Sequence, residues 1–323
     1  MNNFKKIGMS ALAASLVSTS AFAGELTASG SASMSLEGHS GTILLSDTAW
    51  SMADSVTLSG STEMDNGMTV SMAFELDGDE ESATSAYDDN SMTISSDAMG
   101  TIKFSAHGGS SASSAIDGTA AGDMFDNFDS GLTVTGAATK SAAAGDNSFY
   151  YTLPSMVDDL TVSASLNTAG TTGNNALGYN ATYSGVEGLS VSYGMADIET
   201  GASSTSGEQT VMKASYAMGS FTASYSNSDY DVGTANAEAS AQDVTSYAIS
   251  YTVSDSISVT YGTETIESGL AGSTDAEYEG ISASFTSGGL TLSVASQEAS
   301  NISHTTATNE DYDYWSLGLA FAF

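Results

Sequence analysis

Cysteine and arginine are absent from this chain of 323 residues, and lysine is rare. Without cysteine no disulfide can form, so the fold must be stabilised in other ways. The only positive side chains are five lysines, against 39 aspartates and glutamates. A surface with this excess of negative charge repels nucleic acid, whose phosphates need positive partners, so a role in binding DNA or RNA is excluded.

Long apolar runs and proline are also scarce. A transmembrane helix needs about 20 predominantly apolar residues, and no segment after residue 23 approaches that length. Proline occurs once, at Pro154 directly after "YYTL", where it interrupts no central strand pairing. A protein built on transmembrane helices is therefore excluded.

The first 23 residues have the order of parts of a secretory signal peptide. Lys5 and Lys6 precede the short apolar stretch "IGMSALAASLV", and "AFA" at 21–23 provides a small-x-small cleavage pattern. The alternative is a buried N-terminal helix. We expect residues 1–23 to be removed, which leaves a mature domain over residues 24–323.

The expected mature domain carries all 39 acidic residues against three lysines, which gives a formal charge of −36. The three lysines are Lys103, Lys140 and Lys213. An acidic composition rich in serine, threonine and glycine is also typical of disordered segments. The tyrosines, phenylalanines and valines recur too regularly for a solvated coil, so we expect an ordered fold. The acidity is compatible with ion selectivity and with adaptation to high salt, and the sequence leaves both open.

The chain ends in "YDYWSLGLAFAF", in which every second residue is bulky and apolar. These residues are Trp315, Leu317, Leu319, Phe321 and Phe323. Between them lie Tyr314 and then serine, glycine and alanine. Alternation with a period of two is typical of a β-strand whose two faces meet different surroundings.

The same alternation recurs along the mature chain, and we count sixteen such segments. In chain order they are "ELTASGSASMSL", "SVTLSGSTEM", "MTVSMAFEL", "SMTI", "TIKFSA", "SFYYTL", "LTVSASL", "LGYNATY", "LSVSYGMA", "QTVMKASYAM", "SFTASYS", "VTSYAISYTV", "SISVTYGTET", "EYEGISASFTS", "LTLSVAS" and the closing segment. Tight connections such as "DNG", "DAMG", "VEG" and "GG" alternate with longer ones rich in Asp, Glu, Ser, Thr and Gly. This pattern predicts an up-and-down sheet with short turns at one end and long loops at the other.

The two faces of these segments differ in a way that indicates their surroundings. One face is Leu, Val, Ile, Phe, Tyr and Met, and the other is almost all Ser, Thr, Ala and Gly. A soluble sandwich usually carries Lys and Glu on its polar face, whereas a small neutral face suits a water-filled interior. The apolar faces run for about 9 to 11 residues, enough to cross a bilayer when tilted, and a sheet in lipid must close on itself.

The sequence therefore predicts an all-β fold, a transmembrane antiparallel up-and-down β-barrel of about 16 strands. A soluble β-solenoid or a secreted β-rich adhesin is the alternative. Such proteins lack the regular alternation of short turns and long loops along the chain.

Two stretches resemble the general-diffusion porins of the Gram-negative outer membrane. "YWSLGLAFAF" resembles the C-terminal assembly signal of outer-membrane barrels, with Trp315, Phe321 and Phe323 as its residues. "NSFYYTLPSM…LTVSASL" (147–166) resembles the strand, proline, turn and strand after the third loop of porins. The resemblance covers residues 24–323.

The resemblance implies a multi-pass barrel in the outer membrane, with 16 strands, a homotrimeric assembly and both termini on the periplasmic side. It implies contact with outer-membrane lipid and lipopolysaccharide, and insertion by the barrel-assembly machinery. The implied function is passive diffusion of small hydrophilic solutes and ions, without a cofactor.

In those porins a long third loop folds into the barrel and narrows it. Here the longest gap follows the fifth segment, at about residues 107–147, and a loop of that length is usually functional. Its acids are Asp117, Asp123, Asp126 and Asp129. If they line a constriction, walls of low dielectric focus their field on passing ions and favour cations. The alternative is that they are solvated loop acids. Family members commonly set arginines opposite this loop, and this chain has none.

Two lysines are expected to point into the barrel. Ile102 and Phe104 belong to the apolar face, so Lys103 between them points into the lumen next to the third loop. Lys213 points inward by the same argument. A lysine that faced lipid at mid-membrane would cost about 2 to 4 kcal/mol. Whether either lysine lies at the constriction or elsewhere on the pore wall remains open.

A divalent-cation site is a weaker hypothesis. "TDAEYE" places Asp275, Glu277 and Glu279 on one strand face, where their oxygens could share divalent cations with neighbouring lipopolysaccharide. No EF-hand spacing is present, so we expect no specific metal site.

Catalysis is not expected. His39, His107 and His304 fall at the ends of segments, no G-x-S-x-G motif is present, and serines are everywhere. A barrel hydrolase is thus an alternative without support, and we assign no catalytic residue. A substrate-specific channel is the more serious alternative. Such a channel needs rows of aromatic or basic side chains along the pore, and these are missing from the expected lumen face. The sequence favours a passive, cation-preferring channel.

Overall fold

A computed structural model describes most of the chain. The described residues are 26–41, 48–77, 88–116, 118–128, 146–168, 175–199, 207–232, 241–304 and 311–323. The expected signal peptide and two of the third-loop acids, Asp117 and Asp129, lie outside them.

Sixteen strands and one short 3-10 helix make up the regular structure of the described residues. They are β1 (Leu26–Gly41), β2 (Thr48–Glu63), β3 (Thr69–Asp77), β4 (Asn90–Ser96), β5 (Gly100–His107), η1 (Met124–Phe128), β6 (Ser148–Thr152), β7 (Leu160–Thr168), β8 (Asn175–Val186), β9 (Leu189–Glu199), β10 (Gly207–Met218), β11 (Phe221–Val232), β12 (Gln242–Ser254), β13 (Ile257–Ser268), β14 (Ala276–Ser287), β15 (Leu290–Ser300) and β16 (Asp311–Ala322). Each of the sixteen predicted segments is one of these strands, so the predicted number of strands is confirmed.

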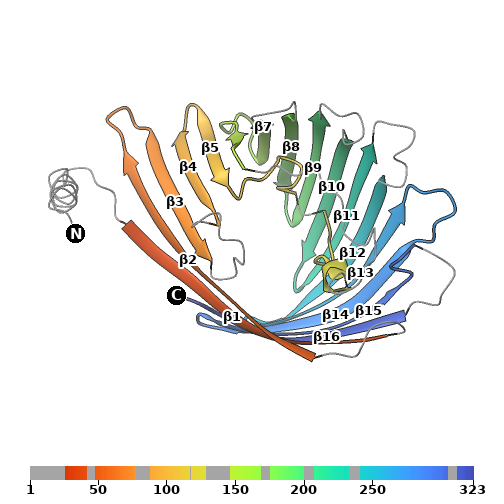
Figure 1. The fold of residues 1–323 in the computed structure, drawn as a ribbon. Coiled ribbons are helices and arrows are strands. Elements are labelled where there is room, and N and C mark those ends of the chain that lie inside the picture. The colour runs from red at the N-terminus through yellow and green to blue at the C-terminus, as the bar shows by residue number, and fades with distance from the viewer. Residues whose placement is uncertain are drawn as a thin grey trace, which may run out of the picture.

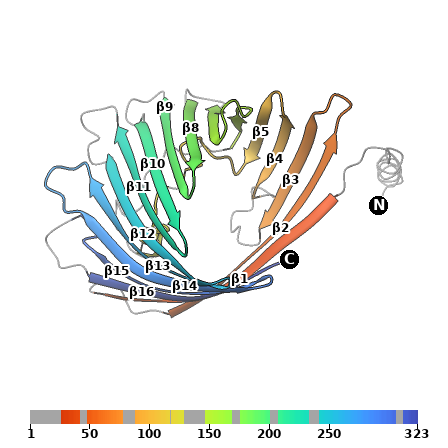
Figure 2. The same cartoon turned by 180° about the vertical axis from the view of Figure 1, so that it is seen from behind.

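Each strand pairs antiparallel with its neighbour in sequence, and β1 pairs with β16 to close the barrel. Figures 1 and 2 show the strands as one continuous curved wall, with the chain running around it in order. Met34 lies opposite Leu319 on one side and Met52 on the other. Closure gives every strand two neighbours, as a sheet within lipid requires.

The connections alternate as the sequence predicts. Met64 to Met68 form the tight turn between β2 and β3, in which the Met64 N–H donates to the Met68 carbonyl at 2.7 Å. Gly67 has a φ of 77° in this turn, a conformation that glycine adopts without strain. The longer connections, of which the third joins β5 to β6, leave the other end of the barrel, called here the loop end.

The outer face of the wall is apolar. On β16, Trp315 and Phe321 are 43 % and 49 % exposed, whereas Tyr312 and Tyr314 point inward and are buried. Apolar side chains such as Tyr247, Ile249 and Ile281 are more than half exposed on other strands. A soluble monomer rarely exposes so continuous an apolar surface, which instead matches the hydrocarbon of a membrane.

The helix η1 has five residues, and within the described ranges no helix is long and apolar enough to cross a membrane. Met124, Phe125 and Phe128 of η1 are buried. They pack in one cluster with inward-facing residues near the loop ends of β12 to β16. The wall residues of this cluster are Val244, Ile266, Ala276, Tyr278, Ala299, Tyr312 and Tyr314, with Ile302 beyond β15.

This cluster corrects one expectation about the inner face. The face was expected to hold almost no large apolar residue, but near the loop end it carries aromatic and aliphatic side chains. The physical reason is the third loop, because the apolar residues of η1 inside the barrel need apolar partners to be removed from water.

Candidate functional site

The described part of the third loop, residues 108–116 and 118–128, runs along the inner wall of the barrel. Its first contacts are on β7 and β8, where the Ala112 N–H donates to the Ser165 Oγ at 2.8 Å and the Asn180 Nδ2 donates to the Ala112 carbonyl at 2.7 Å. On β10 the Gln209 Oε1 accepts a hydrogen bond from the Ser113 Oγ at 3.1 Å. Ser113 and Gln209 are both buried. The loop is thus held against the wall from its first turn.

The middle of the loop is held by β10 and β12. The Lys213 Nζ donates to the Thr119 carbonyl at 2.9 Å. The Ser246 Oγ accepts from the backbone N–H groups of Ala120 and Ala121, at 3.0 and 2.9 Å. These bonds satisfy backbone groups that would otherwise be buried against the wall without a partner.

The end of the described segment reaches the seam where the barrel closes. The Met124 N–H donates to the Glu264 Oε2 at 2.7 Å, and the Glu264 side chain is 1 % exposed. The Asn127 Nδ2 donates to the Gln297 Oε1 at 2.8 Å, and the His39 Nε2 donates to the Asn127 carbonyl at 2.6 Å. The loop therefore crosses the lumen face from β7 to β1.

Aromatic packing fixes η1 at that position. The ring of Phe128 lies 5.8 Å from the ring of Tyr278 and 6.1 Å from the ring of Tyr314, measured between centroids. Phe128 is 1 % exposed. Aromatic pairs of this geometry contribute about 0.5 to 1.5 kcal/mol beyond their burial. Figures 1 and 2 show η1 inside the curve of the wall.

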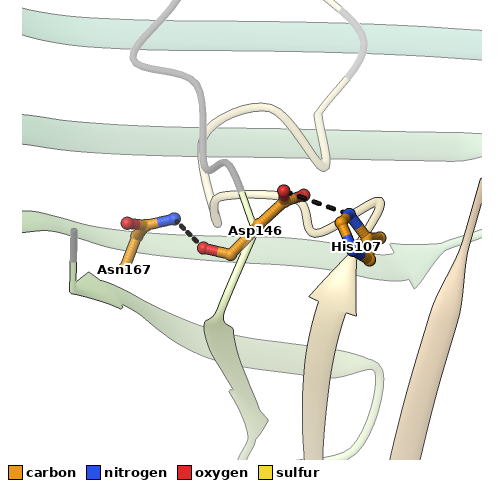
Figure 3. A network of polar contacts seen from close by, with 3 residues as sticks. All are labelled: His107, Asp146 and Asn167. Carbon is orange, nitrogen blue, oxygen red and sulfur yellow. Dashed lines mark hydrogen bonds and ion pairs between the residues drawn. The ribbon is translucent and has the colours of Figure 1, made fainter. Parts of the chain in front are cut away.

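The base of the loop is closed by polar contacts between its two ends (Figure 3). His107, the last residue of β5, pairs through its Nδ1 with the Asp146 Oδ2 at 3.1 Å. The Asn167 Nδ2 of β7 donates to the Asp146 carbonyl at 3.2 Å. The Asn147 N–H donates to the Ala106 carbonyl at 3.3 Å. The two ends of the loop are thus held together where they leave β5 and approach β6.

Two predicted loop acids lie on this inner segment. Asp123 and Asp126 are exposed, and the loop packs on the wall with its other side, so both carboxylates face the barrel interior. The Asp123 Oδ1 accepts a hydrogen bond from the Thr119 Oγ1 at 2.5 Å, which orients the carboxylate. The structure brings these two acids together on one loop. Their role in selectivity stays a prediction.

Lys103 lies on the opposite wall. In the closed order of strands β5 is eight positions from β13, so Lys103 and Glu264 stand on opposite sides of the lumen. Lys103 is exposed on the inner face, and its register partners in the neighbouring strands are Thr93 of β4 and Tyr150 of β6. Lys213 also points inward, but its ammonium holds the Thr119 carbonyl of the loop.

The surroundings of Lys103 are acidic. Partial burial raises the pKa of Asp89, the carboxylates of Asp88 and Glu75 raise it further, and Lys103 and His107 oppose the rise. Asp89 precedes β4 and pairs with Glu75 of β3, whose N–H donates to the Asp89 carbonyl at 2.8 Å. The positive charge of Lys103 is therefore partly offset by the Asp89 carboxylate on its own wall.

Sequence reasoning missed three of these residues: Glu75, Asp89 and Glu264. Glu264 lies in "TETIES". The alternation of side chains along a strand, which placed Lys103 on the inner face, could have placed Glu264 there too. Its partner Met124 is 140 residues away, and no local pattern indicates that contact. His39 was expected at a segment end, but it lies within β1 and holds the loop.

The other singled-out residues face outward or lie at the ends. Glu277 and Glu279 are on the outer face of β14, where the Tyr261 hydroxyl donates to the Glu279 Oε2 at 2.9 Å. The described residues contain no group of three side chains placed to hold a metal ion. Phe323 pairs with Gly30 through two backbone hydrogen bonds of 2.9 Å, which fastens the C-terminus to β1.

Comparison with known proteins decides what this barrel is. The family model of the Gram-negative porins matches residues 9–323. The chain belongs to the Gram-negative porin family. The porin is therefore an outer-membrane β-barrel and a diffusion channel, in a family of channel proteins rather than enzymes.

Solved structures share the porin's fold. One is an anion-selective porin from Comamonas acidovorans, 15 % identical with a TM-score of 0.68, covering 93 % of this chain and 99 % of that chain. A porin refined at 1.8 Å resolution is 19 % identical with a TM-score of 0.64, covering 93 % and 100 %. A multiple mutant of Rh. blastica porin is 16 % identical with a TM-score of 0.61, at the same coverage. No curated protein sequence matches the porin.

Proposed function

We propose that this channel conducts small hydrophilic solutes and ions by passive diffusion with a preference for cations. The single observation that carries the proposal is the pair of exposed carboxylates, Asp123 and Asp126, on a loop that is fastened inside the barrel. The wall opposite offers Lys103, whose charge interacts with the carboxylate of Asp89, and Asp89 in turn lies near the carboxylates of Asp88 and Glu75. We therefore expect a negative electrostatic potential within the passage.

The sign of the preference depends on these residues and not on the fold. The Comamonas acidovorans porin, which shares the fold, is described as anion-selective. A passage enclosed by walls of low dielectric focuses the field of its charges on passing ions, and carboxylates favour cations there. This chain has no arginine with which to reverse the field.

Screening sets the conditions under which the preference is seen. The Debye length is about 10 Å at 0.1 M salt, so the fields of separate carboxylates overlap within the passage. It falls to about 3 Å at 1 M, where only ions close to a carboxylate interact with it. Cation preference should therefore be strong in dilute KCl and weak in concentrated KCl.

Paired variants test where the field arises. We expect Asp123→Asn combined with Asp126→Asn to reduce the cation preference, measured as the reversal potential across a KCl gradient in planar bilayers. Glu277→Gln combined with Glu279→Gln is the matched control, because it removes the same charge from the outer face of β14. Equal effects of the two double variants would show that the loop carboxylates do not set the selectivity.

A substrate-specific channel is the competing proposal. Three of the inward tyrosines, Tyr278, Tyr312 and Tyr314, are at most 5 % exposed beneath η1, so these three offer no aromatic surface to a solute. Conductance recorded with sugars or with inorganic phosphate tests this directly. Saturable block by one solute would favour the substrate-specific channel.

We further propose that residues 1–23 are removed on secretion and that the barrel assembles as a homotrimer in contact with lipopolysaccharide, after insertion by the barrel-assembly machinery. The resemblance of the first 23 residues to signal peptides and of residues 24–323 to trimeric porins supports this. Mass spectrometry should find Gly24 at the mature N-terminus, and sedimentation in detergent should give three chains per particle. A retained leader or a monomer would contradict it.

A further inference from the structure

Four glycines on the inner wall lie directly under the third loop. Gly178 of β8 and Gly194 of β9 lie beneath the first part of the loop. Gly262 of β13 and Gly280 of β14 are directly opposite each other in the sheet and lie beneath its later part. We call these four residues the glycine seat.

A side chain at any of the four positions would meet the loop. A Cβ on Gly262 would lie 2.5 Å from the Ala121 Cβ, and one on Gly194 would lie 2.9 Å from the Ile116 Cδ1. On Gly178 it would lie 2.8 Å from the Ser165 Oγ of the wall and 3.2 Å from the Ala112 backbone nitrogen of the loop. On Gly280 it would lie 2.6 Å from the Gln297 Cγ of the wall and 3.1 Å from the sulfur of the η1 residue Met124. Carbon atoms in contact prefer about 3.5 to 4.0 Å. At Gly262 and Gly194 the loop therefore occupies the space that a side chain would take, and at Gly178 and Gly280 the loop and a wall side chain occupy it together.

The backbone does not require glycine at these positions. None of the four has a φ in the positive region, although glycines elsewhere in the described residues do. Glycine in a strand interior costs about 0.5 to 1 kcal/mol relative to alanine and usually marks a close approach of another backbone. Here the backbone that approaches is the third loop.

We propose that the glycine seat sets the distance between the third loop and the wall, and so sets the width of the passage. The polar contacts from Ser246, Lys213 and Glu264 fasten the loop, and the glycines determine how close to the wall it is fastened. The proposal uses the constriction of the proposed function, but it does not depend on which ion the channel prefers.

The contact between Gly262 and Ala121 gives the sharpest test, because the two can exchange sizes. In Gly262→Ala, relief of the 2.5 Å contact requires the loop to move about 1 Å or more toward the pore axis. We expect a lower single-channel conductance in KCl. Ala121→Gly in the same chain removes the opposing Cβ, which leaves 3.1 Å to the Tyr247 carbonyl as the nearest remaining approach. We expect the double variant to recover the parent conductance.

Controls separate positioning from damage to the barrel. Ser284→Thr adds one methyl group to the inner face of β14, four residues from Gly280, and should leave the conductance unchanged. Heat-modifiable migration on gels checks that each variant forms a barrel. A second pair, Gly194→Ala with and without Ile116→Val, applies the same test at a contact with a flexible side-chain end, where we expect a smaller loss.

Three results would overturn the proposal. They are a parent-like conductance in Gly262→Ala, the same reduced conductance with and without Ala121→Gly, or an equal loss in Ser284→Thr. If Gly262→Ala does not assemble, the Gly194 pair decides by the same criteria. The proposed cation preference fails separately, through the sign of the reversal potential, which this conductance test does not use.

Discussion

Replacing Glu264 by leucine should release the third loop locally without opening the barrel. The Glu264 Oε2 accepts the backbone N–H of Met124 at 2.7 Å, in a position that is 1 % exposed. A buried donor left without its acceptor costs about 1 to 3 kcal/mol, and leucine leaves the fully buried Met124 N–H without this acceptor, so the upper part of that range applies. Leucine has a similar size, so the cavity term is small.

The fastened form of the loop should thus lose about 2 to 3 kcal/mol of stability relative to its open form, and this loss can be expressed as a change in the population of the open form. Each 1.4 kcal/mol is a factor of ten, so the population of the open form of the loop segment should rise by roughly 30- to 140-fold. Glu264→Gln keeps an oxygen acceptor at the same place, so its effect should be several-fold smaller.

Amide hydrogen exchange of the folded protein in detergent measures this opening. Peptides covering residues 119–128 should exchange faster in Glu264→Leu by the factor above, while peptides from β13 and its neighbours keep the parent rate. Unchanged exchange in the loop, or equal acceleration in the leucine and glutamine variants, would refute the assignment of Glu264 as an anchor.

Two further predictions concern assembly and pH. Removing Phe323, or replacing it with serine, should leave the chain secreted but poorly inserted, because deletion removes both backbone bonds to Gly30 and either change removes the terminal ring; a parent level of heat-modifiable barrel would contradict this. Lys103 opposes the raised pKa of Asp89, so Lys103→Met should raise that pKa further. As the pH falls, Asp89 should then become protonated, and its share of the cation preference should be lost, at a higher pH than in the parent. Reversal potentials recorded from neutral to acid pH measure the midpoint, and a midpoint that stays or moves down would count against the acidic surroundings of Lys103.

The wall of the barrel could be predicted from the sequence because its rules are local. A period of two fixes which side chains share a face, and turn sequences such as "DNG" fix where strands end. The same parity argument put Lys103 and Lys213 on the inner face. These inferences need only neighbouring residues.

The path of the third loop could not be predicted in this way. Its anchors Ser165, Ser246, Glu264 and Gln297 lie on four different strands, and each contact joins residues far apart in the chain. Serine and glycine are so frequent here that no single one stands out as an anchor or a seat. The apolar cluster under η1 was missed for a related reason, because inward tyrosines were not expected in a wet lumen.

The reversal potential of the unmodified channel across a KCl gradient tests the central claim most directly. We expect the sign of a cation-preferring pore in dilute KCl, with a magnitude that shrinks toward 1 M as the Debye length falls from about 10 to about 3 Å. An anion-preferring sign in dilute KCl, or a cation preference that does not change between dilute and concentrated salt, would contradict it.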